Sequence, residues 1–223
     1  MIYPFEYAIF GDMMSVFRAF IAVDLSTEVL ERLAQVMDEL RAEIGESAVR
    51  WTPVENMHLT LKFLGDVSMA NVNRLKDIIH TTAASHHEFA FSVGGLGAFP
   101  SAQRARVLWV GVEGPQDLTG IQRMVDTGTA RLGYASENRP FKPHLTLGRV
   151  SRNAGPKDMQ KISQVFKEKK VGFLGVTQVK EIHLFRSDLH TDGAVYSRIY
   201  TTSLAEKKTV SYNKARNGFS AEK

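Results

Sequence analysis

The sequence predicts a two-lobed α+β domain, in which each lobe repeats the order strand, helix, strand, helix, strand. Two observations support this prediction. The tetrapeptide His-Leu-Thr-Leu occurs twice, at residues 58–61 and 144–147, so its two histidines are 86 residues apart. Strand-like and helix-like segments flank both copies in the same order. We therefore predict one domain over residues 16–204, with lobes of about 16–95 and 96–204.

The first lobe opens with a strand-like apolar run at 17–25 and a predicted helix at 27–44. Apolar residues of this helix recur every three or four positions and form one stripe. They are Leu30, Leu33, Met37, Leu40 and Ile44. Ser26 suits the start of the helix, because its hydroxyl can accept a hydrogen bond from a free backbone N–H, and Gly45 suits its end.

The rest of the chain shows similar patterns. Further helices are predicted at about 69–83, 115–132 and 157–169, and further strands at 89–93, 107–112 and 180–186. Gly120 and Gly128 lower the helix propensity of the segment at 115–132. The distance from Arg18 to His58 is 40 residues, and that from Arg106 to His144 is 38. This agreement supports a duplicated unit, with a boundary near the glycine-rich residues 94–97.

Composition and charge limit the possible functions. The chain has no cysteine, which excludes disulfides, zinc-thiolate sites and a cysteine nucleophile and fits a reducing, cytoplasmic location. No apolar run approaches the roughly 20 residues of a membrane-spanning helix. Five basic and two acidic residues in 206–223 supply +3 of the total charge of +4. The body is therefore nearly neutral, which argues against a broad surface for duplex nucleic acid but leaves a short RNA end or a small anion possible.

The two ends of the chain lie outside the repeats. Residues 1–15 fit neither copy, and we predict that they form an N-terminal extension. Residues 205–223 are polar and without sustained periodicity, which indicates a flexible basic tail. A solvated end is the more common role for such a tail than a specific RNA-binding arm.

The repeated tetrapeptide suggests acid–base chemistry. Because a strand alternates its faces, His58 and Thr60 share one face while the two leucines enter the core, and His144 and Thr146 do the same. If the lobes are related by a two-fold axis, both polar faces can meet at a single site. One imidazole could then accept a proton from water and the other protonate a leaving oxygen, while the threonine hydroxyls bind phosphate oxygens.

Two residues lie five positions beyond the histidines, namely Phe63 and Arg149. Strict alternation would put both on the face opposite their histidine, so a role at the site requires a bend or bulge in each strand. Arg149 could then neutralise phosphate charge with its planar fork of donors. Phe63 could stack on a base, although filling core volume is the more common role of phenylalanine.

Simpler interpretations apply to single features. One His-Leu-Thr-Leu segment alone would more often be a structural strand, and the matched repeat is what favours function. His80, His86, His87 and His190 are predicted to face solvent without a role, and His183 to pack within a strand. The cluster His86-His87-Glu88 lacks the spacing of metal ligands, so we predict no metal and no cofactor.

The sequence resembles the two-histidine (2H) phosphoesterases, specifically the RNA 2′,3′-cyclic phosphodiesterases, also called 2′-5′ RNA ligase-like proteins. The matching segments are 18–25, 51–53, 58–65, 139–149 and 184–189. Residues 139–149 read Arg-Pro-Phe-Lys-Pro-His-Leu-Thr-Leu-Gly-Arg. A single His-x-Thr would be weak support, whereas two in this setting are highly specific.

The resemblance implies antiparallel sheets that line a central cleft, with helices outside. It also implies hydrolysis of RNA or nucleoside 2′,3′-cyclic phosphates to 2′-phosphates, with His58 as the acid and His144 as the base. Thr60, Thr146 and Arg149 would bind phosphate, and Phe20 and Phe63 could line a nucleotide site. A binding module without turnover, and the joining or cleavage of 2′-5′ linkages, remain alternatives. We expect a monomer.

Overall fold

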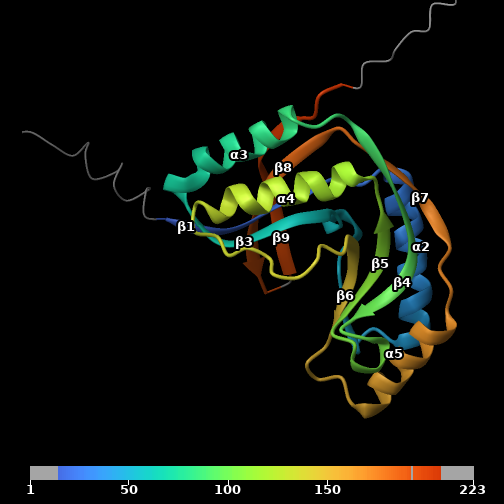
Figure 1. Cartoon of the computed structure of the whole chain (residues 1–223). Coiled ribbons are helices and arrows are strands. Elements are labelled where there is room, and N and C mark those ends of the chain that lie inside the picture. Colours follow the sequence, from blue (N-terminus) through green and yellow to red (C-terminus); the bar gives the residue numbers. More distant parts are fainter. Residues whose placement is uncertain (1–14, 192, 207–223) are drawn as a thin grey trace, which may run out of the picture.

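The computed structural model describes residues 15–191 and 193–206, and these form two antiparallel sheets flanked by helices (Figure 1). The first sheet has the order β3-β1-β8-β9 and the second the order β2-β6-β5-β4-β7. The strands of the first sheet are β1 (Val16–Val23), β3 (Leu59–Ser68), β8 (Glu181–His190) and β9 (Gly193–Ser203). Those of the second are β2 (Val49–Trp51), β4 (Phe89–Phe99), β5 (Val107–Glu113), β6 (His144–Val150) and β7 (Phe173–Val179).

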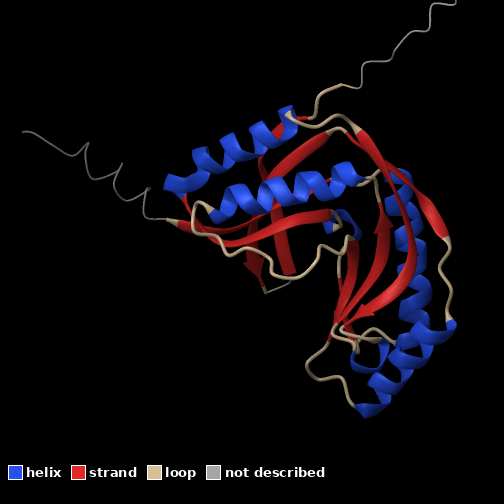
Figure 2. Cartoon of the chain, viewed as in Figure 1, coloured by secondary structure: helices blue, strands red, loops and turns tan. Residues whose placement is uncertain are grey.

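Two α-helices cover each sheet on its outer side, as Figure 2 shows. The helices α3 (Val72–Ala84) and α4 (Gln116–Ala130) pack together over the first sheet. The helices α2 (Thr27–Ile44) and α5 (Pro156–Glu168) pack together beside the second. Three short 3₁₀ turns, η1 (Val54–Asn56), η2 (Met69–Asn71) and η3 (Ala102–Arg104), complete the elements of the described chain.

The two sheets share a pseudo-symmetric order. In the first sheet, whose order is β3-β1-β8-β9, the strand that follows His58 lies at one edge. In the second, β6-β5-β4-β7 repeats this arrangement with the strand of His144, and the short β2 is added beside β6. The duplicated order of elements predicted from the sequence therefore has a counterpart in the fold. Every pair of neighbouring strands in the two sheets is antiparallel.

The sheets do not coincide with the stretches 16–95 and 96–204, which the sequence analysis assigned to separate lobes. The strands β2 and β4 belong to the second sheet, although they lie wholly or mostly in the first stretch. The strands β8 and β9 come from the second stretch and extend the first sheet, because β8 pairs with β1. Each lobe of the structure thus combines segments from both halves of the chain.

The helix at 27–44 begins and ends where the sequence predicts. The Ser26 hydroxyl accepts a hydrogen bond from the Val29 N–H at 3.4 Å, which caps the first turn. Gly45 has a φ of 104°, a conformation that favours glycine, and stops the helix. Four of the five predicted stripe residues are buried, namely Leu33, Met37, Leu40 and Ile44, while Leu30 is half-buried. The apolar stripe therefore fixes this helix in the core.

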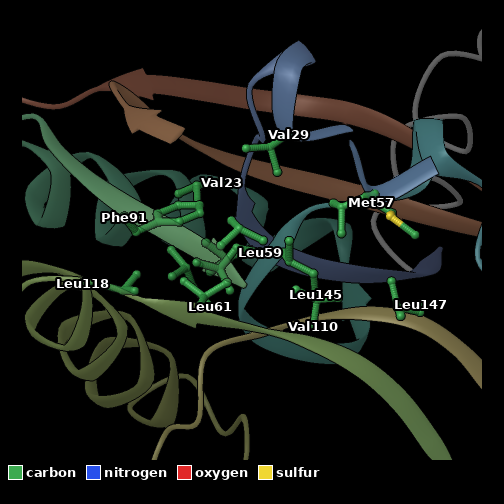
Figure 3. Close-up of a cluster of buried hydrophobic side chains, with 14 of the residues drawn as sticks. Val23, Val29, Met57, Leu59, Leu61, Phe91, Val110, Leu118, Leu145 and Leu147 are labelled. Atoms are coloured by element: carbon green, nitrogen blue, oxygen red, sulfur yellow. The ribbon is translucent and has the colours of Figure 1, made fainter. Parts of the chain in front are cut away.

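One apolar core joins the two sheets. Leu59 and Leu61 of β3 and Leu145 and Leu147 of β6 are at most 3% exposed and belong to the same buried cluster (Figure 3). Each repeated tetrapeptide is therefore anchored by both of its leucines, as the alternation of a strand predicts.

The ends of the chain fall mostly outside the described residues, and this applies to the predicted extension at 1–15 and to most of the tail at 205–223. Ala205, at the start of that tail, is bonded to the segment after α3. Its N–H donates to the His86 carbonyl at 2.9 Å, and its carbonyl accepts from the Glu88 N–H at 2.9 Å. The backbone hydrogen bonding of the described chain thus extends one residue beyond the predicted domain end at 204.

Candidate active site

The two His-x-Thr units lie on the faces of β3 and β6 that point away from the shared leucine core. We call these the front faces. Thr60 and Thr146 are half-buried there, between leucines that are almost fully buried. His58 immediately precedes β3, and His144 is the first residue of β6. The predicted alternation of polar and apolar side chains is therefore present in both strands.

A bulge in each strand brings Phe63 and Arg149 back to the front face. In β3, Thr60 pairs with Ala22 but Lys62 pairs with Ile21, so one residue is left unpaired between them. In β6, Thr146 pairs with Trp109 but Gly148 pairs with Leu108. An extra residue reverses the alternation beyond it. Phe63 is accordingly 66% exposed, and Arg149 is exposed too.

Both imidazoles are held by the same kind of hydrogen bond. The Nδ1 of His58 lies 2.8 Å from the Asn56 carbonyl oxygen, and the Nδ1 of His144 lies 2.7 Å from that of Lys142. A carbonyl can only accept, so Nδ1 carries the proton in each ring. The neutral ring then keeps its lone pair on Nε2. The two histidines are therefore prepared in the same tautomer, with Nε2 left for proton transfer.

Aromatic rings enclose His58. The ring of Phe20 stacks on the imidazole at a centroid distance of 4.4 Å, and the ring of Tyr196 meets it edge-on at 5.4 Å. Phe185 stacks with Phe20 at 5.1 Å and lies 6.0 Å from the imidazole itself, again between ring centroids. Burial lowers the pKa of His58 to about 4, although the bond to Asn56 and the nearby Asp24 carboxylate act in the opposite direction. His58 is therefore neutral near pH 7 in the free protein.

His144 has a comparable setting in the second sheet. Phe99 and Trp109 meet its ring edge-on, at 4.9 Å and 6.3 Å between centroids. Gly97 makes room for the indole, because a Cβ there would lie 2.2 Å from atoms of Trp109. Burial lowers the pKa of His144, the hydrogen bond to Lys142 opposes this, and the charge of Arg149 lowers the pKa further. Both imidazoles are thus biased towards their neutral forms.

The Tyr196 phenol of the first sheet lies close enough to Arg149 of the second for its pKa to be affected. Tyr196 lies on β9, pairs in register with Ser187 of β8, and Ser187 pairs in turn with Arg18 of β1. Burial raises the pKa of the Tyr196 phenol, while the charges of Arg149 and Arg18 act to lower it. Arg149 of the second sheet therefore acts on His144 and also on a ring that contacts His58 of the first.

A buried histidine, His183, joins a polar cluster with the exposed Asp24 and Arg198 on the first sheet. His183 is 1% exposed, and its Nδ1 lies 2.9 Å from the Thr201 hydroxyl. Its Nε2 lies 3.4 Å from the Asp24 carboxylate, which also accepts a hydrogen bond from Arg198. The predicted packing of His183 within a strand is confirmed.

The residues predicted as site members therefore fall into two groups. His58, Thr60 and Phe63 belong to the front of the first sheet, and His144, Thr146 and Arg149 to the front of the second. Phe20 also belongs to the first group, but it is only 2% exposed because His58, Phe185 and Tyr196 cover its ring. Phe20 thus supports the imidazole and offers little surface to a nucleotide.

Several aromatic neighbours of the histidines were not predicted from the sequence. These are Phe185 and Tyr196 beside His58, and Phe99 and Trp109 beside His144. Trp109 lies on the strand next to β6, Phe185 and Phe99 lie one strand further from β3 and β6, and Tyr196 lies at the opposite edge of the first sheet from β3. A correct pairing of strands would have been needed to find them, since none is close to a histidine in sequence.

In residues 15–191 and 193–206, no three His, Asp or Glu side chains are placed to hold a metal ion together. The same part of the chain contains no helix with both the length and the apolar character needed to cross a membrane.

Comparison with known proteins gives a consistent result. The LigT like phosphoesterase family matches residues 23–109 and again residues 110–196, which reproduces the internal repeat. An RNA 2′,3′-cyclic phosphodiesterase from Methanothermobacter thermautotrophicus is 34% identical over 180 residues, covering 81% of this chain and 95% of that protein. The Escherichia coli protein of the same name is 32% identical over 138 residues, covering 61% and 74%.

Solved structures share the fold. TT0787 of Thermus thermophilus superposes with a TM-score of 0.71 at 25% identity, covering 85% of this chain and 99% of its own. Escherichia coli LigT complexed with 3′-AMP gives a TM-score of 0.67 at 27% identity, with the same coverage. With two matches that together span most of its length, this chain belongs to the family of LigT like phosphoesterases.

Proposed function

We propose that the protein hydrolyses RNA or nucleoside 2′,3′-cyclic phosphates to 2′-phosphates, with His58 and His144 acting on one phosphate. The proposal rests on one observation: the same kind of hydrogen bond holds both imidazoles in the same tautomer. Each donates from Nδ1 to a carbonyl two residues earlier, at 2.8 Å and 2.7 Å, and each is followed by a front-facing threonine. The names of the relatives support the same activity.

The reaction needs one proton acceptor and one proton donor. Nε2 of His144 takes a proton from water as the water oxygen attacks phosphorus. The bond from phosphorus to the ribose 3′ oxygen breaks, and Nε2–H of His58 protonates that oxygen. The products are a 2′-monophosphate and a free 3′ hydroxyl. Proton exchange with solvent then restores both histidines, so acid–base catalysis accounts for every step.

Charge at phosphorus requires donors around it. Thr60 and Thr146 can donate from their hydroxyls to the non-bridging oxygens, where charge builds up in the transition state. Arg149 is exposed and makes no ion pair among the described residues, so its guanidinium is available to the phosphate. Phe63, 66% exposed beside Phe20, can stack on the base.

The acid must be protonated before it can act. In the free protein burial holds the pKa of His58 at about 4, so the ring is mostly neutral near pH 7. A bound cyclic phosphate carries a negative charge, and a nearby negative charge favours the imidazolium. Substrate binding is therefore the event that prepares His58 to donate its proton.

The test is turnover of a nucleoside 2′,3′-cyclic phosphate in excess EDTA, with identification of the product isomer. We expect the 2′-monophosphate, and we expect His58→Ala and His144→Ala each to lower the rate by about 10²-fold or more. His80→Ala is the control, because this exposed histidine lies on α3, outside the site. Full activity in either site variant would exclude the paired mechanism.

Other outcomes lead to other functions. A 3′-monophosphate would reverse the leaving group, and the 3′-AMP complex of Escherichia coli LigT makes this isomer the relevant comparison. Binding of AMP without turnover would indicate a binding module, and joined products from RNA with cyclic-phosphate ends would indicate 2′-5′ ligation. The cytoplasmic location and the monomeric state stay predictions.

A further inference from the structure

Asn56 makes two hydrogen bonds that point in different directions. It is the last residue of η1, lies two positions before His58 and is half-buried. Its backbone carbonyl accepts from Nδ1 of His58 at 2.8 Å. Its side-chain Nδ2 donates to the carbonyl of Ala194 at 2.9 Å. Asn56 therefore joins the histidine to a segment 138 residues away in the chain.

The turn around Asn56 is itself fixed by backbone bonds. The N–H of Asn56 donates to the Pro53 carbonyl, and the N–H of Met57 donates to the Val54 carbonyl, both at 3.0 Å. Just before the turn, the N–H of Thr52 donates to the Leu147 carbonyl of β6 at 2.9 Å. These bonds leave the Asn56 carbonyl free to accept from His58 and hold it in one place.

The segment that Asn56 holds carries Tyr196. Ala194 lies in β9 near the end of the β8–β9 hairpin, where it pairs with Leu189, and Tyr196 follows two residues later. Residues two apart in a strand share a face. The Tyr196 ring meets His58 edge-on at 5.4 Å and Phe20 at 4.9 Å. The side-chain amide of Asn56 thus holds in place the β8–β9 hairpin, whose Tyr196 packs against the imidazole of His58.

Among the described residues, His144 has no equivalent side-chain hydrogen bond to a distant strand. His144 also bonds through Nδ1 to a carbonyl two residues earlier, at 2.7 Å. That carbonyl belongs to Lys142, whose exposed side chain makes no hydrogen bond or ion pair with other described residues. The two units therefore share the backbone bond, while the side-chain link to a distant strand is specific to the first.

We propose that Asn56 is a positioning residue for His58, because it holds the β8–β9 hairpin against η1 and so keeps Tyr196 over the imidazole. The backbone carbonyl of Asn56 orients the imidazole of His58, and its side chain keeps Tyr196 against that imidazole. This role rests on the proposed function of His58 as the proton donor. It predicts that loss of the amide changes the chemical step more than substrate binding.

The surroundings of His58 determine the direction in which its pKa changes when the Asn56 amide is lost. Asp24 faces it from the end of β1, and the neutral phenol of Tyr196 faces it from β9. His183 and Arg198 contact Asp24, and Arg149 of the second sheet acts on Tyr196. Burial is the largest influence on the His58 ring, so a looser hairpin exposes the ring to water and raises its pKa towards 6.5.

The experiment compares the full-length protein with Asn56→Ala and Asn56→Ser. Serine keeps a polar side chain in the turn but is too short to reach Ala194. The control is Glu55→Ala, an exposed residue of the same 3₁₀ turn. NMR titration follows the ring protons of His58 and His144 in each protein, with signals assigned from His58→Ala and His144→Ala. Steady-state kinetics on a nucleoside 2′,3′-cyclic phosphate give kcat and KM.

We expect both Asn56 variants to raise the pKa of His58 by about one unit or more and to leave that of His144 unchanged. We expect kcat to fall by about 10- to 100-fold, because the lost orientation of the ring outweighs its easier protonation, and KM to change by less than about three-fold. The Glu55→Ala protein should match the wild type. The far-UV and near-UV circular dichroism of every variant should match too.

Two results would overturn the proposal. One is an unchanged titration of His58 together with an unchanged kcat in both Asn56 variants. The other is an equal shift of both histidines, which would indicate general loosening of the domain. If the wild type turns over no cyclic phosphate but the Asn56 variants still shift His58 alone, then the proposed function fails while the positioning by Asn56 stands.

Discussion

The ring of Phe20 lies at 17° to the plane of the His58 imidazole, with 4.4 Å between the ring centroids. Phe20 is 2% exposed, whereas Phe63, its partner in the register of β1 and β3, is 66% exposed. Two phenylalanines that the sequence suggested for the same role therefore have different environments. One supports the histidine from within the protein, and the other faces solvent beside it.

Replacing these two residues should separate stability from substrate binding. Phe20→Ala opens a cavity under the imidazole, and we expect a loss of about 3–5 kcal/mol in the free energy of unfolding. Phe63→Ala should change it by less than about 0.5 kcal/mol, yet raise KM for a cyclic nucleotide by about 10-fold through lost stacking. Urea denaturation and initial-rate kinetics measure the two effects. Equal destabilisation by both variants would contradict this assignment.

Replacing Arg149 should alter both the rate and its pH dependence. The positive charge of Arg149 contributes to the lowered pKa of His144, after the larger effect of burial. Arg149→Ala should therefore raise the pKa of His144, and the limb of kcat/KM that requires its neutral form should move to higher pH. We also expect kcat/KM to fall by about 100-fold, with partial recovery in Arg149→Lys.

The matched control for this prediction is Arg152→Ala, an exposed arginine just after β6. It removes the same charge from the protein without emptying the site. If Arg152→Ala weakens activity as much as Arg149→Ala does, net charge rather than a specific phosphate contact is responsible.

The stability of the protein should fall as the solution becomes mildly acidic. The pKa of His58 is about 4 in the folded protein and 6.5 in an unfolded chain, so the unfolded state binds a proton first as the pH drops. The penalty is absent above pH 6.5 and grows down to about pH 4. Between pH 7.5 and 5.0, His58 alone should reduce the free energy of unfolding by about 2 kcal/mol.

The pKa values of His144 and His183 are also lowered, first of all by burial, so both residues add to the loss with the same sign. Urea unfolding at the two pH values measures the sum. The variant His58→Gln should show a smaller difference than the wild type. A wild-type protein that is equally stable at both pH values would rule out neutral, buried histidines.

The ion pair between Lys62 and Asp126 should matter more than any exposed pair. Lys62 is 7% exposed, and its Nζ contacts both the Asp126 carboxylate of α4 and the Ala135 carbonyl. Burial is the largest single influence and favours the neutral form of Asp126, but the hydrogen bonds from Lys62, Glu137 and Ser136 and the charge of Lys62 together outweigh it and lower the pKa. Asp126→Ala leaves the lysine charge buried and unpaired, which should cost about 3–5 kcal/mol.

Two comparisons sharpen this test. Glu28→Ala removes one partner of the exposed pair with Arg32 and should cost less than about 0.5 kcal/mol. Lys62→Met removes the charge and keeps the volume, so it should be milder than Asp126→Ala. Thermal or urea unfolding of the three proteins gives the order. Similar costs for Glu28→Ala and Asp126→Ala would show that burial does not strengthen the Lys62 pair.

The sequence predicted local structure well where a single pattern decides it. The helix at 27–44 was predicted to the residue, because its apolar stripe, its serine cap and its terminal glycine agree. Helices α4 and α5 differ from the prediction by one or two residues at each end, and the segment at 69–83 begins as η2 before α3. The face of each His-x-Thr unit was also correct, since buried leucines alternate with it.

Strand pairing was beyond the reach of these patterns. β2, β7 and β9 were not predicted. β2 has only three residues, and β9 alternates among mostly exposed or half-buried side chains at a sheet edge, so neither contains a marked apolar run. The pairing of β8 with β1 joins residues more than 150 positions apart, which local periodicity does not encode. Tyr196, Phe185 and Trp109 were missed for this reason.

The bulges were partly predictable. From strand alternation, Phe63 and Arg149 were predicted to reach the site only through a bend, and the register shows one at Leu61 and another at Leu147. Their position could not be derived, because the residues concerned are ordinary leucines. The bulges lie there because of tertiary packing, since a bulge lets each leucine and the residue after it both face the core.

The helices α2 and α4 each follow a strand of one sheet and then cover the other, since α2 follows β1 but packs beside the second sheet, and α4 follows β5 but packs over the first. The two copies of the repeat are therefore interlocked. A chain cut near residue 95 would yield two fragments, neither owning a complete sheet with its helices, and we expect them to fold only when mixed.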